Sequence, residues 1–171
     1  MLTPPSTWVS RWADEVPAGG PVLDVAAGQG RHSLFFLGRG HPVTAVDRDV
    51  AGLRALGDRP GFRVVAADLE AATWPLPGAC FAAVVVTNYL WRPLLPLLIE
   101  SLAPGGTLIY ETFARGHERF GRPSNPEFLL RPGELLEAVR GRLLVRAYEH
   151  GPERAPRAAV RQKICALNRV E

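Results

Sequence analysis

The sequence predicts an α/β fold: a doubly wound sheet of seven strands, mostly parallel, completed by an antiparallel hairpin. Three observations lead to this prediction. Apolar, β-branched runs alternate five times with helix-like segments, as in parallel sheets with crossover helices. The run FAAVVVT at 81–87 is apolar on both faces, which is typical of a central parallel strand. The last two apolar runs are joined by a turn of Gly, Pro and Arg, which predicts a hairpin.

The first half of the chain gives six elements. Ser6 or Thr7 is an N-cap for the first helix, and PAGGP at 17–21 ends it. Gly40 and Gly57 close the next two helices. The predicted elements are a helix at 7–16, a strand at 22–27, a helix at 31–39, a strand at 42–46, a short helix at 50–56 and a strand at 62–67.

The second half continues the alternation and then departs from it. Two prolines leave little room for a helix at 70–78, and APGG at 103–106 predicts a turn. Residues 113–131 are polar and too long for an ordinary connection, so we expect a lid or binding loop there. The remaining elements are a strand at 81–87, a helix at 92–102, a strand at 107–112, a helix at 132–140, and strands at 143–149 and 159–168.

Length and composition indicate a single domain over residues 1–171, with nearly half of the residues apolar. We expect the helix within residues 1–20 to lie over a ligand cleft. Trp8 and Trp12, one helical turn apart, would either pack the helix over that cleft or belong to the core. The sequence has no run of about 18 apolar residues, so it does not predict a membrane span. The start has no apolar signal core, and Cys80 and Cys165 lack metal-ligand spacing. We expect reduced core thiols, no metal and a cytoplasmic protein.

The positive charge comes almost entirely from arginine and is concentrated between Arg115 and Arg161. A dense basic cluster would indicate nucleic acid. These arginines alternate with acids, so a mixed solvated face is the favoured interpretation. A local site for an anionic ligand stays open.

The polar residues of the predicted sheet gather where strands end. In a doubly wound sheet, ligands bind beyond the carboxyl ends of the strands, beside the first strand. This rule brings together the turn at 26–30, Asp47, Asp68, and the pair Thr87 and Asn88.

The turn AAGQG at 26–30 is suited to close approach of a ligand, because its residues are small and the next helix begins with free N–H groups. The dinucleotide pattern G-x-G-x-x-G is incomplete here, since Ser33 stands at its third glycine. Asp47, at the end of the second strand, can accept two hydrogen bonds from a ribose diol. Asp68 can accept from an adenine amino group. These residues fit both NAD and S-adenosylmethionine.

Five segments in order resemble the class I S-adenosylmethionine-dependent methyltransferases, which have a Rossmann-like fold. They are LDVAAGQGRHS, VTAVDRD, AADLE, FAAVVVTNYLW and LAPGGTLIYETF. The resemblance covers roughly residues 22–170. It is nearest to small stand-alone bacterial enzymes of the tellurite-resistance and thiopurine methyltransferase-like group. Ala26 stands where many members have the first glycine, and Ala27 stands where close relatives have cysteine; both are small.

The resemblance implies S-adenosyl-L-methionine as cofactor and assigns residues to it. The methionine end would be held by Asp24, Ala26, Gly28 and Gly30, with Arg31 near the carboxylate. Asp47 would hold the ribose, Asp68 and Leu69 the adenine, and Asn88 would lie near the sulfur.

The acceptor is left open by the sequence. A thiolate or a similar soft nucleophile needs no general base, whereas oxygen or carbon acceptors usually need one. The candidate catalytic residues are Asn88, Tyr89, Glu111 and His117. The loop arginines Arg115, Arg119 and Arg122 would suit an anionic acceptor.

We therefore expect a methyltransferase acting on a small molecule. The alternatives are an RNA or protein methyltransferase, a cofactor-binding subunit without catalysis, and an NAD-dependent oxidoreductase. The absence of an N-P-P-Y-like motif after the fourth strand lowers the nucleic-acid class. The L-x-P-G-G turn counts against the oxidoreductase.

Overall fold

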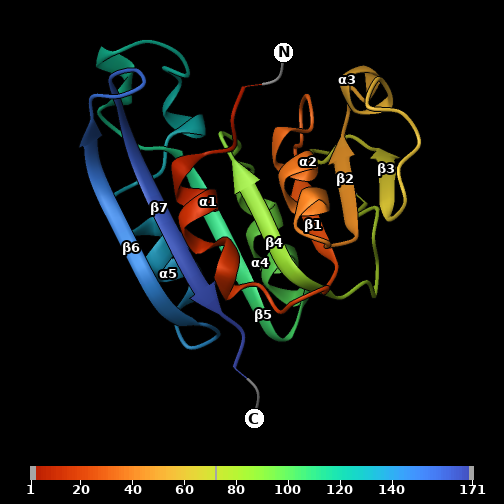
Figure 1. The fold of residues 1–171 in the computed structure, drawn as a ribbon. Coiled ribbons are helices and arrows are strands. Elements are labelled where there is room, and N and C mark those ends of the chain that lie inside the picture. Colours follow the sequence, from red (N-terminus) through yellow and green to blue (C-terminus); the bar gives the residue numbers. More distant parts are fainter. Residues whose placement is uncertain (1–2, 72, 170–171) are drawn as a thin grey trace.

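The computed structural model describes residues 3–71 and 73–169. Its sheet has the strand order β3-β2-β1-β4-β5-β7-β6 (Figure 1). The strands are β1 Val22–Val25, β2 Val43–Asp47, β3 Phe62–Ala66, β4 Phe81–Thr87, β5 Leu102–Phe113, β6 Leu144–Glu153 and β7 Ala159–Leu167. The order reverses between β1 and β4, which places a topological switch point beside β1.

The first five strands are parallel, and β7 is antiparallel to both β5 and β6. This confirms the predicted fold class, including the closing hairpin. In Figure 1 the parallel strands point to one end of the molecule, where the long connection after β5 and the N-terminal segment also lie.

Helices cover both faces of the sheet (Figure 1). α1 (Thr7–Trp12) and α2 (Arg31–Gly38) lie on one face, and α4 (Leu95–Glu100) and α5 (Glu134–Val139) on the other. α3 (Ala51–Arg54) is a short turn after β2. Each face has its own apolar core, because strands such as β4 bury side chains on both sides.

The first helix is shorter than predicted and packs on the sheet. α1 ends at Trp12 and continues as a 3₁₀ turn, Ala13–Glu15. Trp8 is buried, and its indole N–H donates to the Ile164 carbonyl at 3.2 Å. The two tryptophans therefore belong to the core on this face, and residues 3–7, which end at the first residue of α1, reach the strand ends.

The predicted turn at 103–106 is a bulge inside β5. Leu102 pairs with Phe81, but Thr107 already pairs with Ala83. The side-chain amide of Asn168 donates to the Leu102 and Ala103 carbonyls at 3.0 and 3.1 Å, and the Asn168 carbonyl accepts from Gly105 N–H. The strand begins five residues earlier than predicted because the chain end stabilises the bulge.

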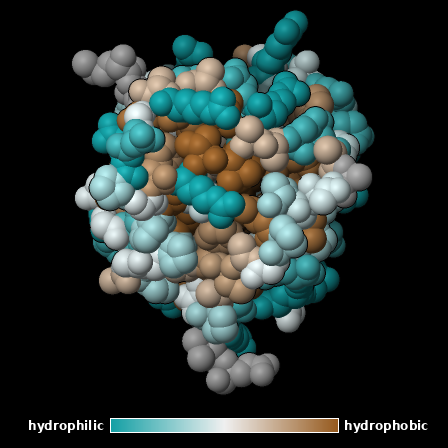
Figure 2. Space-filling view, turned by 90° about the vertical axis from the view of Figure 1, so that its right-hand side faces the viewer, coloured by the Kyte–Doolittle hydropathy of each residue, from teal (hydrophilic) through white to brown (hydrophobic). Residues whose placement is uncertain are grey.

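The edge of the sheet at β3 is only partly covered. Phe62, Val64 and Val65 are half-buried there. Figure 2 shows the molecule from this side, with apolar side chains gathered in the middle and hydrophilic ones around them.

The structure tests two expectations, one about the two thiols and one about membrane-spanning helices. Cys165 is buried in β7, but Cys80 is exposed just before β4, so the prediction of two core thiols is wrong for Cys80. Within the described residues, every helix is too short or too polar to cross a membrane.

Candidate functional site

Two cavities lie at the carboxyl ends of the strands. The smaller, of about 380 Å³, is lined by Ala26, Asp47, Arg48, Ala67, Asp68, Leu69, Glu70, Asn88, Tyr89, Leu90, Thr112, Phe113, Pro123 and Phe128. The larger, of about 910 Å³, is lined by residues 3–7, 120–122 and 155–159, together with Arg31, Asn88, Glu111, Phe113, His117, Glu153, Arg161 and Lys163. Asn88 and Phe113 line both cavities, so the cavities meet at the end of β4.

The loop between β1 and α2 is held by strained and small residues. Ala26, Gly28 and Gly30 have φ of 52°, 56° and 79°, in the left-handed region. A Cβ on Gly28 would meet open space, whereas one on Gly30 would lie 2.7 Å from Leu56 Cδ1. Glycine is therefore favoured at position 30 by conformation and by the space that Leu56 takes, and at position 28 by conformation alone. Of the three, Ala26 lines the smaller cavity.

Asp24 lies beneath this loop and lines neither cavity. It is 2% exposed, and its carboxylate accepts from the Ser33 hydroxyl at 2.6 Å. Burial raises the pKa of Asp24 to about 6, although the bonds from Ser33 oppose this. The geometry gives Asp24 the part of holding the first turn of α2 rather than of touching a ligand.

The two acids predicted to bind a nucleoside both line the smaller cavity. Asp47 accepts from Gly28 N–H at 2.8 Å and from Asp49 N–H at 3.0 Å. A carboxylate has about four acceptor positions, so Asp47 keeps capacity for a diol while fixing the glycine loop. The side-chain carboxylate of Asp68 accepts only from Glu70 N–H at 3.0 Å among the described residues, and Leu69 beside it is buried.

Asn88 lies where the cavities meet, with φ of 56°. Left-handed backbone at a residue other than glycine is uncommon and occurs often at functional sites. The Asn88 side-chain oxygen accepts from Arg161. The guanidinium of Arg161 also lies over the Phe113 ring, 4.1 Å from its centroid. The residue at the junction is thus oriented by the hairpin strand β7.

Glu111 opens onto the larger cavity from β5 within a charged cluster. Lys163 lies 2.7 Å from Glu153 and 4.0 Å from Glu111, and Arg161 lies 2.6 Å from Glu153. All four side chains are at most 26% exposed. The carboxylates balance the two cations, so this cluster forms a charged but compensated wall.

His117 is buried rather than placed on the surface. It is 4% exposed, and its ring stacks on Phe113 with centroids 4.2 Å apart. Nε2 lies 3.1 Å from the Arg122 carbonyl, which can only accept, so Nε2 carries the proton. Nδ1 is then a lone-pair acceptor, and it has no hydrogen-bond partner among the described residues.

The N-terminal segment is tied to the start of α2 and forms a wall of the larger cavity. Arg31 donates to the Pro4 carbonyl at 3.2 Å, and His32 Nε2 accepts from Ser6 N–H at 3.1 Å. Burial, with a smaller effect of Arg31, lowers the pKa of His32 to about 4. His32 is therefore neutral near pH 7 and keeps this bond.

The two cavities have opposite formal charge. Among the described lining residues, the smaller has three carboxylates against one guanidinium, which gives −2. The larger has five cations against two carboxylates, which gives +3. Arg122 and Arg157 have no carboxylate within 4.0 Å in the described part of the chain. The larger cavity thus attracts anions, and the smaller one attracts cations.

Sequence reasoning found the strand-end residues but missed several others. Phe113 ends the last of the five resembling segments but had no predicted role, and Arg161, Pro123 and Phe128 lie outside those segments. A signal existed for the last two, since residues 113–131 were predicted to be a binding loop. The N-terminal region was predicted to lie over the cleft through its helix, but the residues before that helix, 3–6, were not singled out.

No family model matches the chain. A search of curated proteins also finds no match.

Comparison with solved structures shows which fold this is. TehB from Haemophilus influenzae matches with a TM-score of 0.76 and 19% identity, over 95% of this chain and 61% of that one. Burkholderia thailandensis 1,6-didemethyltoxoflavin-N1-methyltransferase, with bound S-adenosylhomocysteine, matches with a TM-score of 0.74 and 20% identity, over 95% of this chain and 77% of that one. An S-adenosylmethionine-dependent methyltransferase from Mesorhizobium loti matches with a TM-score of 0.73 and 17% identity, over 95% of this chain and 99% of that one.

The chain therefore has the fold of the class I S-adenosylmethionine-dependent methyltransferases, which confirms the resemblance at the level of the fold. TehB-type structures are among those it matches, and the chain spans 61% of the length of the TehB structure above.

Proposed function

We propose that this chain is an S-adenosylmethionine-dependent methyltransferase that acts on a small-molecule acceptor. The cofactor would occupy the smaller cavity and the acceptor the larger one. One observation carries the proposal: two cavities of opposite charge meet at Asn88, at the switch point of a methyltransferase fold.

The residues of the smaller cavity fit the cofactor. Asp47 has acceptor capacity for a ribose diol, and Asp68 with Leu69 forms a polar and apolar pair suited to adenine. The hydroxyl of Tyr89 is buried there without a partner among the described residues. A cationic sulfonium suits a cavity with a formal charge of −2.

At the methionine end, Ala26 would contact the cofactor. Arg31, predicted to lie near its carboxylate, lines the larger cavity instead and donates to the Pro4 carbonyl. Gly28 and Gly30 shape this loop, and Asp24 holds it from below. The structure thus supports direct contacts for Ala26 and indirect ones for Asp24.

The bound cofactor supplies an electrophilic methyl group on sulfur. The chain has to align the acceptor in line with it and exclude water. Asn88, held by Arg161 and by its own N–H bond to the Glu111 carbonyl at 3.0 Å, is the residue placed to align the two ligands.

The acceptor is proposed to be anionic, because five cations against two carboxylates give the larger cavity a formal charge of +3. For an acceptor that must lose a proton, His117 is the proposed base, since its Nδ1 lone pair is unpartnered among the described residues. Glu111 is the less suitable candidate because Lys163 already lies beside it.

Calorimetric titration with S-adenosylmethionine, S-adenosylhomocysteine and NADH tests the cofactor. Asp47→Ala is expected to weaken binding of both sulfur ligands at least about tenfold, because charge-assisted hydrogen bonds contribute about 1.5–3 kcal/mol each. Asp49→Ala is the matched control, since the Asp49 carboxylate accepts from Ala51 N–H and lines neither cavity. Binding of NADH alone would refute the proposal.

Turnover is tested next with thiols, chalcogen oxyanions and aromatic carboxylates as acceptors. Methylation of a carboxylate-bearing acceptor, but not of its neutral amide, is expected if charge selects the acceptor. Cofactor binding without any turnover would favour a non-catalytic subunit.

A further inference from the structure

We propose that the Phe128 ring covers the nucleoside end of the smaller cavity, and that the Arg92–Glu134 ion pair is the device that positions it. This inference rests on the proposed function. Phe128 is part of a 3₁₀ turn, Pro126–Phe128, at the far end of the long connection.

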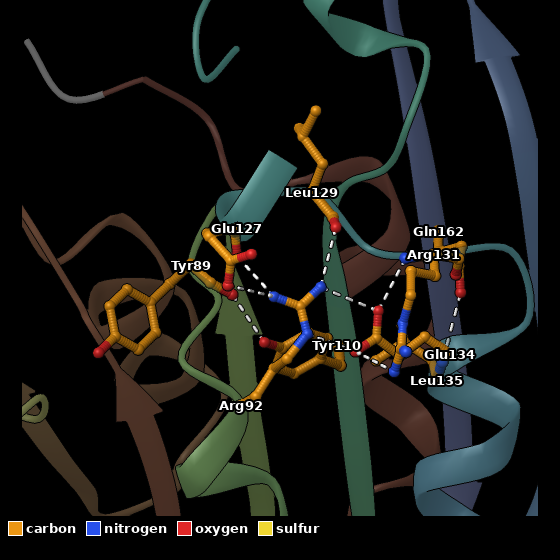
Figure 3. Close-up of polar contacts among 9 residues, drawn as sticks. All are labelled: Tyr89, Arg92, Tyr110, Glu127, Leu129, Arg131, Glu134, Leu135 and Gln162. Carbon is orange, nitrogen blue, oxygen red and sulfur yellow. Dashed lines mark hydrogen bonds and ion pairs between the residues drawn. The ribbon is translucent and has the colours of Figure 1, made fainter. Parts of the chain in front are cut away.

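Arg92 is bonded to the chain on both sides of Phe128. Its Nη1 donates to the Glu127 carbonyl at 2.6 Å, and its Nη2 donates to the Leu129 carbonyl at 3.0 Å (Figure 3). Arg92 directly follows the TNYLW segment after β4, so these two bonds connect the long connection to the strand end that bears Asn88. These bonds fix the backbone on either side of Phe128.

Glu134 holds the guanidinium in this orientation. Its carboxylate accepts from Arg92 Nε at 2.6 Å and from Nη2 at 3.1 Å, a two-point contact that fixes the plane of the fork. The same carboxylate accepts from Arg131 N–H at 2.7 Å. Glu134 is 6% exposed, and the bonds from Arg92 and Arg131 lower its pKa although burial raises it.

The end of the connection is therefore fixed at several backbone positions. Gln162, fully buried in β7, donates to the Arg131 carbonyl and accepts from Leu135 N–H at 3.3 Å (Figure 3). Leu129 and Leu130 are 1% and 0% exposed. Such a segment has little freedom left to lose when a ligand binds.

Phe128 is 43% exposed, whereas the apolar residues that follow it, Leu129 and Leu130, are buried. It lines the smaller cavity together with Asp47, Asp68 and Leu69, the residues proposed to bind the nucleoside. An aromatic ring held in place at the mouth of a nucleoside site is suited to stack on a base or pack on a ribose. The chain thus presents a preorganised apolar cover.

Phe120 offers a matched control on the same connection. It is 51% exposed but lines the larger cavity and not the smaller one. The inference predicts that only one of the two rings affects the nucleoside.

The first test measures binding of S-adenosylhomocysteine and of 5′-methylthioadenosine, which lacks the amino-acid end. Phe128→Ala is expected to raise both dissociation constants about tenfold, as loss of one stacking contact does. Phe120→Ala should leave both within about twofold of the wild type. Equal affinity of the wild type and Phe128→Ala would overturn the inference while the proposed function stands.

The second test addresses Arg92 through Arg92→Lys. A lysine keeps the charge beside Glu134, but its single ammonium cannot span the carboxylate and both carbonyls. We expect Arg92→Lys to lower the affinity for 5′-methylthioadenosine in the wild-type and Phe120→Ala backgrounds. In the Phe128→Ala background, adding Arg92→Lys should cause no further loss of affinity. Equal losses in all three backgrounds would show that Arg92 acts only on stability. If the wild type bound neither ligand, the proposed function would be refuted and this inference with it.

Discussion

Replacing Asp24 by Asn tests the electrostatics beneath the proposed cofactor loop. Burial raises the pKa of Asp24 from 3.8 to about 6. The folded chain then holds this proton more tightly than the unfolded chain. The stabilisation that the bound Asp24 proton gives to the fold is complete below pH 3.8 and is lost as the pH rises through about 6. At about 1.4 kcal/mol per pKa unit, the ionised carboxylate costs about 3 kcal/mol at neutral pH.

His32 has the opposite effect in the same pH range. Its pKa is lowered from 6.5 to about 4, mainly by burial. Its neutral form stabilises the fold above pH 6.5, and this stability is lost as the pH falls toward 4. In the wild type the two slopes oppose each other, so a single pH profile hides both.

Urea unfolding of the wild type, Asp24→Asn and His32→Gln at pH 4.5 and 7.5 separates them. Of the Asp24 cost, about 2 kcal/mol develops between these two values. The difference in free energy of unfolding between Asp24→Asn and the wild type should therefore move by about 2 kcal/mol in favour of the variant at the higher pH. His32→Gln should move the other way. A wild-type-to-Asp24→Asn difference that does not change with pH would refute the reasoning.

The remaining predictions concern backbone positions. Gly28→Ala and Gly30→Ala each place a side chain at positive φ, which costs about 1–2 kcal/mol, and Gly30→Ala should lose a further 1–3 kcal/mol, roughly, because its Cβ would lie 2.7 Å from Leu56. Equal losses in urea unfolding would contradict this. Asn168→Ala should lower stability by about 1–3 kcal/mol and speed hydrogen exchange at Gly105 N–H. Unchanged exchange would show that the bulge holds without its amide bonds.

The sequence predicted those elements whose bounds are set by the residues within them. β4 has the predicted bounds, because an apolar run of seven residues buried on both faces leaves no other register. The start of β5 was not predictable in this way. Pro104, Gly105 and Gly106 read as a turn, and the bonds that make them a bulge come from Asn168, far along the chain.

The same division holds for the candidate site. Asp47 and Asp68 follow strands of a parallel sheet, so the fold rule alone places them at one edge. Phe128 and Arg161 reach the cavities through Arg92 and Glu153, which no periodicity connects with them. Residues positioned by ion pairs across the fold leave no trace in a single sequence.

The opposite charges of the two cavities also bear on turnover in the proposed reaction. Methyl transfer converts a sulfonium cation into a neutral thioether, so the spent cofactor no longer gains from a cavity of formal charge −2. An anionic acceptor would likewise lose the cation that faced it across Asn88. In the proposed reaction, methyl transfer would thus weaken the charge attraction that assembled the complex, which favours release of the products.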